Sequence, residues 1–424
     1  MGRAAGTPPV AEWRYGCIVI GCLFIFVALC GTAWSASDVN LGALRSTLLP
    51  MRGKRPDDAT GPRGATPQLT VAKHQLLDWL DSRLGSLTRE VDRLEIQRNL
   101  NIELRETGLF CNYGGPVESR CPDWTLSGFV GRVTIDWSAA FLVVTAGMGI
   151  ECGYDESAYV YSWNGQKWVR VWQNEQNTYT KDGYKPQTLH SVLISPYNRA
   201  NDYLVLTLGS ESWCSSNWHD VYYRVFRLGP DQEAQPLVKG SEWTAVGWRE
   251  PPIVGSISAD DVLVEHLTRS IDTGILAREG VCHSEIQHGR VNRIDPFALG
   301  PRDFVDEWLK TDWRESSTWS ESANRRTMRD WRGEFDKERA TGEFLYPTMH
   351  CNTTPDLWQV GLDLTPDAEG PNTKPNQVYF LVRWRPPYRF RMVSVTDKPS
   401  PACTEKDAGA DDPKRRLFPV QEWR

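Results

Sequence analysis

The sequence predicts a mainly β protein, a β-propeller-like array of four four-stranded repeats with a helical insertion, preceded by a transmembrane helix and a short heptad helix. An apolar run that recurs along the chain, a hairpin pattern after each run, and one uncharged segment near the N-terminus support this prediction. With 424 residues, the chain is long enough for a large core, and its net charge of −6 comes from interspersed acidic and basic residues. A basic stripe, which nucleic-acid binding requires, is absent from the sequence, so no nucleic-acid partner is expected.

The recurring apolar run is the most informative feature of the sequence. Residues 141–147 (FLVVTAG) match residues 203–209 (YLVLTLG), and similar runs follow at 261–265 and 357–362. The first steps are about 60 residues long, a period typical of repeat architectures, and the last step contains an insertion. Continuous apolar runs of this length are typical of strands that are buried on both faces.

Each apolar run is flanked by further strand signals. A shorter strand is predicted before each run, at 130–135, 191–195, 253–258 and 344–350. A hairpin is predicted after each run, at 159–163 with 168–172, 222–228 with 236–239, 281–286 with 290–294, and 378–384 with 388–395. Four strands in each of four units predict a propeller-like array, and one or two antiparallel β-sandwiches are the alternative.

The first hairpin resembles those of a known group of propellers. Tyr161-x-Trp163-Asn164-Gly165-x-x-Trp168, together with the order of strand, loop and hairpin, is similar to the blades of FG-GAP or VCBS-like propellers over residues 126–395. The calcium-binding Asp-x-Asp-x-Asp-Gly loop of those families does not occur in this sequence. The resemblance therefore implies a propeller fold without calcium, and no cofactor is expected.

The N-terminal region predicts export. Residues 16–34 contain no charged residue and are long enough to span a bilayer as a helix, which would leave residues 1–15 in the cytoplasm. A cleaved signal sequence, with Ala33-Trp34-Ser35 at the cleavage site, is the alternative. We therefore expect a membrane-anchored protein with an extracytoplasmic domain, or a secreted protein if the segment is removed.

The region between this segment and the repeats predicts a spacer. Residues 35–69 are rich in Pro, Gly and charge, which is typical of a flexible stem. Residues 70–107 predict a helix whose apolar residues follow a heptad pattern: Leu77, Leu80, Leu84, Leu87, Val91 and Leu94. The helix could form a coiled coil in a homo-oligomer, or it could pack on the domain that follows. The β-repeat domain is assigned to 109–398, its helical insertion to 296–342 and a C-terminal tail to 399–424.

Cysteine usage also favours an oxidising compartment. The chain has 10 cysteines, of which Cys17, Cys22 and Cys30 lie in the apolar segment. The others lack the spacing of a zinc site, so no metal is predicted and disulfides are the better account. The expected pairs are Cys111–Cys121, Cys152–Cys214 and Cys351–Cys403, with Cys282 left over.

Loop length predicts where a ligand would bind. The connections between the second and third strands of each unit, and between units, are predicted to be long and to open on one face of the array. The candidate ligand-binding residues in or beside these loops are Glu151, Tyr154, Asp155, Trp213, Trp218, His219, Asp220, Arg269 and Asp272.

The sequence favours a binding or scaffold module that recognises a protein or glycan through this long-loop face. The first alternative is an exported glycan hydrolase that uses carboxylates such as Asp155, Glu156 or Asp220 as acid and base. A structural envelope protein is the second alternative. No nucleophile elbow, phosphate-binding glycine loop or HExxH helix occurs in the sequence, so no catalytic residue is assigned.

Overall fold

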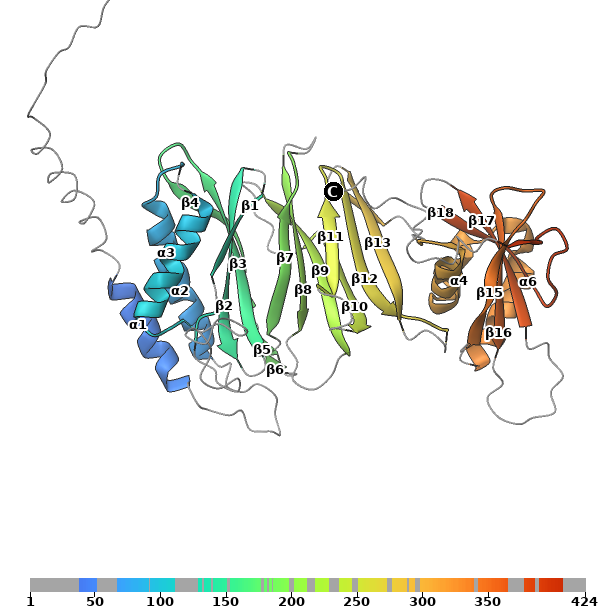
Figure 1. Cartoon of the computed structure of the whole chain (residues 1–424), viewed down its shortest axis with the longest axis horizontal. Coiled ribbons are helices and arrows are strands. Elements are labelled where there is room, and N and C mark those ends of the chain that lie inside the picture. The colour runs from blue at the N-terminus through green and yellow to red at the C-terminus, as the bar shows by residue number, and fades with distance from the viewer. Residues whose placement is uncertain are drawn as a thin grey trace, which may run out of the picture.

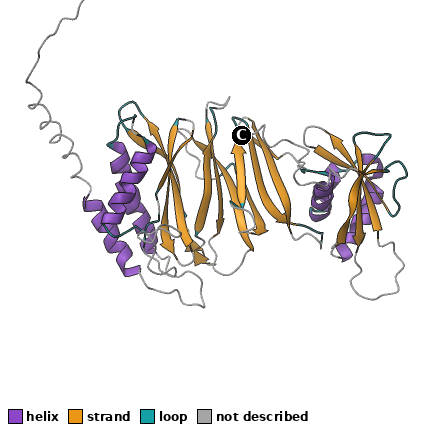
Figure 2. Ribbon diagram, viewed as in Figure 1, coloured by secondary structure: helices purple, strands orange, loops and turns teal. Residues whose placement is uncertain are grey.

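The protein is mainly β, with four antiparallel sheets and two groups of helices (Figures 1 and 2). The computed structural model describes residues 38–51, 67–90, 92–110, 129–131, 133–138, 140–150, 153–176, 179–180, 183–184, 186–197, 202–211, 218–228, 236–245, 251–272, 277–287, 290–293, 298–338, 342–364, 377–385 and 389–406.

Each sheet is a meander of four consecutive strands. The first sheet contains β1 (Thr134–Ser138), β2 (Phe141–Ile150), β3 (Gly153–Trp163) and β4 (Trp168–Asn174). The second contains β7 (Gln187–Ile194), β8 (Tyr203–Glu211), β9 (Trp218–Leu228) and β10 (Val238–Ala245). The third contains β11 (Ile253–Ile257), β12 (Asp261–Arg269), β13 (Ala277–Gln287) and β14 (Arg290–Arg293). The fourth contains β15 (Gly342–His350), β16 (Leu357–Leu364), β17 (Gln377–Arg385) and β18 (Arg389–Thr396), with β19 (Glu405–Lys406) added at its edge.

The repeat that the sequence predicts is confirmed at the level of the sheets. The four recurring apolar runs form β2, β8, β12 and β16, each the second strand of its meander. The Asn164-Gly165 turn connects β3 to β4, and Gly165 has a φ of 98°, a conformation that glycine adopts without a steric cost. A short ribbon of β5 (Tyr179–Thr180) and β6 (Gly183–Tyr184) follows the first sheet.

The four sheets do not close into a ring. The first three stand next to one another in a row, and the fourth belongs to a separate lobe (Figure 1). The first and second sheets share an apolar core that includes Val143 and Val205, and the second and third share one that includes Leu206 and Val264. The predicted array of repeats is therefore present, but as an open row.

Helices cover one face of the fourth sheet, and α4 (Pro301–Lys310) lies between this sheet and the third (Figure 1). The fourth sheet packs its apolar face on α4 and α6 (Arg325–Glu338), which share its core through residues such as Phe304 and Met328. The connection between them contains α5 (Trp313–Ser316), η3 (Ser317–Trp319) and η4 (Ser322–Asn324). The predicted helical insertion is thus confirmed, and it occupies a sheet face that would otherwise be available to a neighbouring sheet.

The N-terminal helices cover the first sheet. They are α1 (Asp38–Leu48) with η1 (Leu49–Met51), α2 (Pro67–Gly85) and α3 (Arg93–Glu106), and their apolar residues belong to the same core as β1–β4. Leu44 and Leu48 are fully buried, so residues 38–51, which were expected in a flexible stem, form part of the folded domain.

The heptad pattern does not form one continuous helix. It is divided between α2 and α3, and the Asp92 side chain caps α3 by accepting a hydrogen bond from the Leu94 amide. Leu80 and Leu84 are buried in the core with the first sheet, whereas Leu94 is 60% exposed. These residues follow the alternative prediction, in which an amphipathic helix packs on the domain that follows. Leucines at this spacing form one apolar stripe, which can pack either on a second helix in a coiled coil or on a sheet.

Two further predictions concern the membrane segment and the disulfides. Residues 16–34 lie outside the described residues, and among the described helices none is both long and apolar enough to span a membrane. The predicted disulfide between Cys351 and Cys403 is present, and Cys282 is a buried thiol. The remaining predicted pairs, Cys111–Cys121 and Cys152–Cys214, lie outside the described residues.

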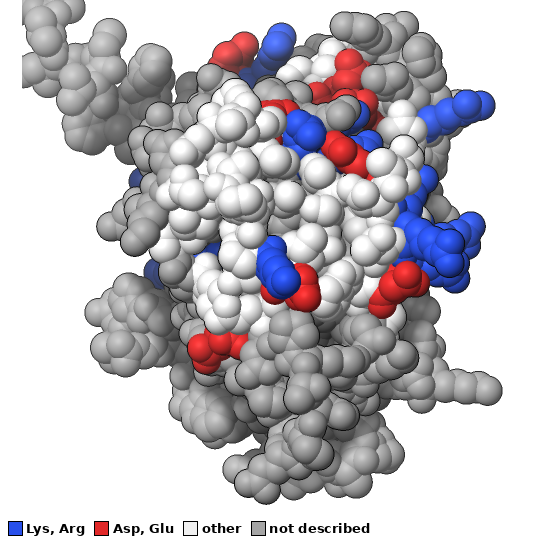
Figure 3. Space-filling view, turned by 90° about the vertical axis from the view of Figure 1, so that its right-hand side faces the viewer, with Lys and Arg blue, Asp and Glu red and all other residues white. Residues whose placement is uncertain are grey.

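The lobe of the fourth sheet forms one end of the molecule, and uncharged side chains cover much of the described part of that end (Figure 3). Figure 3 shows this end face-on, with a broad area of uncharged side chains and basic residues gathered mainly at one edge of the view. Acidic and basic side chains lie close together in several places on this face.

Candidate functional site

The residues predicted for ligand binding do not form one cluster. Glu151 and Trp213 lie outside the described residues, and the side chain of Trp218 is not described. The others lie on three elements: Tyr154 and Asp155 on β3, His219 and Asp220 on β9, and Arg269 at the end of β12, with Asp272 in the segment after it. The connection predicted at 148–157 is mostly strand, since β2 extends to Ile150 and β3 begins at Gly153.

Asp155 and Glu156, two of the three carboxylates proposed for acid–base chemistry, hold the first two sheets and α2 together. Asp155 is fully buried, forms an ion pair with Lys73 of α2, and accepts a hydrogen bond from the Gln187 amide of β7 at 3.3 Å. Its neighbour Glu156 accepts a hydrogen bond from the Leu189 amide of β7 at 2.5 Å. The prediction of a ligand-facing Asp155 is therefore wrong, because the β2–β3 hairpin carries this residue into the interface between the sheets.

Burial perturbs both carboxyl groups. It raises the pKa of Asp155 to about 6, although the Lys73 ammonium acts in the opposite direction. It raises the pKa of Glu156 to about 7, although the hydrogen bond from Leu189 favours the charged form. A perturbed pKa often marks a functional site, but buried structural contacts have the same effect and account for these two groups.

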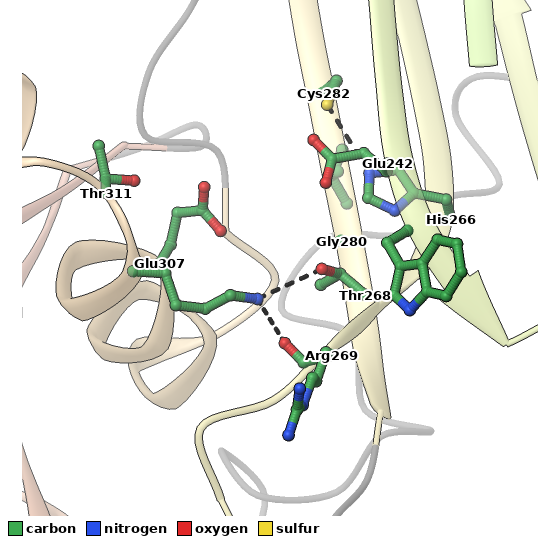
Figure 4. Close-up of a pocket in the computed structure, with 11 residues that line it drawn as sticks. Glu242, His266, Thr268, Arg269, Gly280, Cys282, Glu307 and Thr311 are labelled. Atoms are coloured by element: carbon green, nitrogen blue, oxygen red, sulfur yellow. Dashed lines mark hydrogen bonds between the residues drawn. The ribbon is translucent and has the colours of Figure 1, made fainter. Parts of the chain in front are cut away.

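A cavity lies where the second and third sheets meet α4 of the lobe that contains the fourth sheet. Its volume is about 370 Å³, and its walls come from β10, β12, β13 and α4 (Figure 4). We call this space the cleft, and the residues that line it are Glu242, Trp243, His266, Thr268, Arg269, Gly280, Val281, Cys282, Glu307, Lys310 and Thr311. Arg269 is the member of the predicted ligand-binding set that lines it.

The position of the cleft follows from the topology. β10 ends at Ala245, β12 ends at Arg269 and β13 begins at Ala277, so these three strand ends lie beside connections that the sequence predicts to be long. The helical insertion that supplies Glu307 and Lys310 is another of these connections. Ligand sites are common where separate parts of a fold meet, which makes the cleft the best candidate site in the described residues.

Charged groups attach α4 to the third sheet along one wall of the cleft. The guanidinium of Arg278 lies 2.8 Å from Asp306 and 2.7 Å from Glu307. Asp306, which is fully buried, also accepts hydrogen bonds from the Ser270 hydroxyl and the Ile271 amide, each at 2.8 Å. Burial alone would raise the pKa of Asp306, but Arg278 and Lys310 hold it below its usual value.

A second group of polar side chains forms the opposite wall. Val264 pairs with Cys282 and His266 pairs with Gly280 across β12 and β13, so His266 and Cys282 lie on the same face of the third sheet. Glu242 reaches this face from β10 of the second sheet, and the ligand atoms of Glu242, His266 and Cys282 lie within 4.8 Å of one another. Figure 4 shows the three side chains together, with the Cys282 Sγ 3.8 Å from the His266 Nε2.

The imidazole of His266 is held in a specific place. It is 3% exposed, and burial lowers its pKa to about 4, so the ring is neutral at pH 7. Its Nδ1 lies 3.4 Å from the Leu267 carbonyl oxygen, which favours a proton on Nδ1 and leaves the lone pair of Nε2 toward Cys282. A Cβ at Gly280 would lie 2.7 Å from the His266 Cε1, so the glycine provides the room that the ring occupies.

Sequence reasoning missed this group. Residues 242, 266 and 282 come from three strands of two sheets and form no short motif. The one available signal is a histidine inside the apolar run of β12 (DVLVEHLTR), where most neighbours are apolar and buried.

The sequence matches no protein-family model, and it matches no curated protein. The functional conclusion below therefore depends on the geometry of the cleft and on the organisation of the chain.

Proposed function

We propose that the chain is an extracytoplasmic, membrane-anchored binding module that recognises a glycan in the cleft. The observation that carries this proposal is Trp243, which lines the cleft and is 52% exposed. An exposed indole in the wall of a cavity offers a large apolar face on which a ring of a ligand can stack.

The other side chains of the cleft suit a polyhydroxylated ligand. Glu242 and Glu307 supply hydrogen-bond acceptors, and Arg269 and Lys310 supply donors. A sugar hydroxyl can therefore both donate and accept hydrogen bonds here. The apolar face of a sugar ring can stack on Trp243 while its hydroxyls bond to these groups. A volume of about 370 Å³ lies within the range of small-ligand sites.

Export to an oxidising compartment is part of the proposal. The Cys351–Cys403 disulfide supports it, since such bonds persist mainly outside reducing compartments. Residues 16–34 would hold the domain at the membrane, or would be removed to give a secreted form.

The hydrolase alternative is less well supported. Asp155 and Glu156 bond to β7 between the first two sheets, so they are not placed to act on a ligand in the cleft. A hydrolase would have to use Glu242 and Glu307, the carboxylates that line the cleft. Release of new reducing ends from a bound glycan, and loss of this release in Glu307→Gln, would favour the hydrolase over the binding module.

The test is glycan binding by the full chain and by two tryptophan variants. We expect the wild-type chain to bind a subset of a glycan array, and Trp243→Ala to weaken binding at least tenfold, about 1.4 kcal/mol. Trp137→Ala is the matched control, because Trp137 is 41% exposed on β1 of the first sheet. Equal binding by wild-type chain and Trp243→Ala would contradict the proposal, and so would binding of a protein partner with no glycan bound.

A further inference from the structure

Glu242, His266 and Cys282 bring three different metal-binding groups to one point of the cleft. A carboxylate, an imidazole and a thiol converge from β10, β12 and β13, with all three ligand atoms within 4.8 Å of one another. We propose that these side chains bind a divalent metal of the zinc class and leave one coordination position open toward the cleft. This inference does not depend on glycan binding.

The distances fit a tetrahedral ion. Zn–S and Zn–N bonds of about 2.3 and 2.0 Å at a tetrahedral angle place sulfur and nitrogen about 3.5 Å apart. The Cys282 Sγ and the His266 Nε2 are 3.8 Å apart, close to that separation. The three ligand atoms lie within 4.8 Å of one another, so the partly exposed Glu242 carboxylate has to approach by at most about 1.5 Å.

The chemistry of the three groups selects the kind of metal. A thiolate and an imidazole favour zinc and similar transition metals, and they disfavour magnesium and calcium, which prefer oxygen ligands. Three protein ligands with the fourth position open to a cavity is the arrangement of zinc sites that bind water or a ligand. The cleft provides that open side, because all three residues line it.

Charge balance also favours a cation here. A thiolate at Cys282 and a carboxylate at Glu242 would neutralise a divalent ion in a region where Cys282 is 7% exposed. Arg278 and Lys310 lie 2.8 and 3.6 Å from Asp306 of α4, and Lys310 also interacts electrostatically with Glu242.

The surrounding structure holds the ligands in position. His266 and Cys282 lie on adjacent strands with a fixed register, and Gly280 leaves space for the imidazole between them. The Leu267 carbonyl oxygen near the His266 Nδ1 is the type of outer contact that orients a metal-binding histidine. The alternative is that Cys282 packs as a small apolar residue in the core of the second and third sheets and binds no metal.

Cobalt binding tests the proposal directly. The full chain, after treatment with a chelator, is titrated with Co²⁺, whose bond to a thiolate gives an absorption band in the near ultraviolet. We expect one equivalent of Co²⁺ to bind and Zn²⁺ to displace it. Cys282→Ser should abolish the band, and His266→Gln should weaken binding by more than about a hundredfold, since loss of an outer partner alone costs about 10–100-fold.

Three further variants separate a metal site from a general effect on folding. Glu242→Gln changes a partly exposed side chain, and it should weaken Co²⁺ binding by about tenfold or more with the circular dichroism unchanged. His283→Gln is the matched control, because His283 is a buried histidine on the opposite face of β13, 3.1 Å from Asp261. It should leave Co²⁺ binding unchanged, and so should Trp243→Ala, which tests glycan binding separately.

The proposal is overturned if the wild-type chain shows no thiolate–cobalt band. It is also overturned if the band persists in Cys282→Ser, or if Glu242→Gln and His283→Gln both bind Co²⁺ as the wild-type chain does. The wild-type titration alone decides the first case, even if a core variant fails to fold.

Discussion

The glycine beside His266 gives a prediction whose size can be worked out from the structure. In Gly280→Ala, the new Cβ would lie 2.7 Å from the His266 Cε1, 3.1 Å from the Thr268 Cγ2 and 3.2 Å from the His266 Nε2. Carbon atoms pack at about 3.5–4.0 Å, so the imidazole has to move by about 1 Å. Since the ring is 3% exposed, its neighbours have to move too, and overpacking of this kind costs about 1–3 kcal/mol.

The assay is urea unfolding, with a second glycine as the control. Gly333 lies in α6, and an added Cβ there meets nothing within 4 Å. Gly333→Ala should therefore raise the free energy of unfolding by about 0.5–1 kcal/mol, because alanine favours a helix. The reasoning is refuted if Gly280→Ala is as stable as the wild-type chain, or if both variants lose the same stability.

Three more predictions concern contacts away from this ring. Burial raises the pKa of Glu156 from 4.5 to about 7, so the folded chain holds this proton more tightly than the unfolded chain, and stability falls as the pH rises through that window. Between pH 5 and pH 8, the unfolding free energy of Glu156→Gln should fall by about 2–3 kcal/mol less than that of the wild-type chain. Asp306→Ala leaves Arg278 buried without this partner and should cost about 3–5 kcal/mol in urea unfolding, and an unchanged midpoint would contradict the role given to this pair. Cys403→Ser opens a disulfide with a sequence separation of 52 and should cost about 4 kcal/mol in thermal unfolding, whereas a loss below about 1 kcal/mol would show that the bond contributes little.

The strands could be predicted from the sequence because their signals are local. The apolar runs that form β2, β8, β12 and β16 are continuous and recur at a regular spacing, so each identifies a buried strand wherever its sheet lies. The hairpins followed from turn residues such as Asn164 and Gly165.

Ring closure could not be predicted, because it depends on what covers each sheet. Leu80 and Leu84 are spaced as in a coiled coil, yet they pack with the first sheet. Phe304 and Trp308 of α4 similarly fill the face of the fourth sheet. An apolar stripe shows that a helix buries one side, but it does not show which partner buries it.

The predicted ligand-binding residues and the cleft share Arg269, and the other residues that line the cleft were not predicted. Loop length pointed to the strand ends at which Arg269 and α4 meet, and the cleft lies there. His266 and Cys282 lie within strands, and their approach depends on the register of β12 with β13, which the sequence does not specify. Asp155 was misplaced because an acidic residue beside a predicted loop is usually exposed, whereas here Lys73 pairs with it inside the fold.

The second and third sheets bring Glu242, His266 and Cys282 to one point, and the proposed metal site depends on this convergence. Anomalous X-ray scattering at the zinc absorption edge, from crystals of the full chain grown with Zn²⁺, tests it directly. We predict one strong peak within bonding distance of the His266 Nε2 and the Cys282 Sγ, on the side that faces the cleft. A peak elsewhere, or no peak with these two side chains on different faces of the third sheet, would contradict the account.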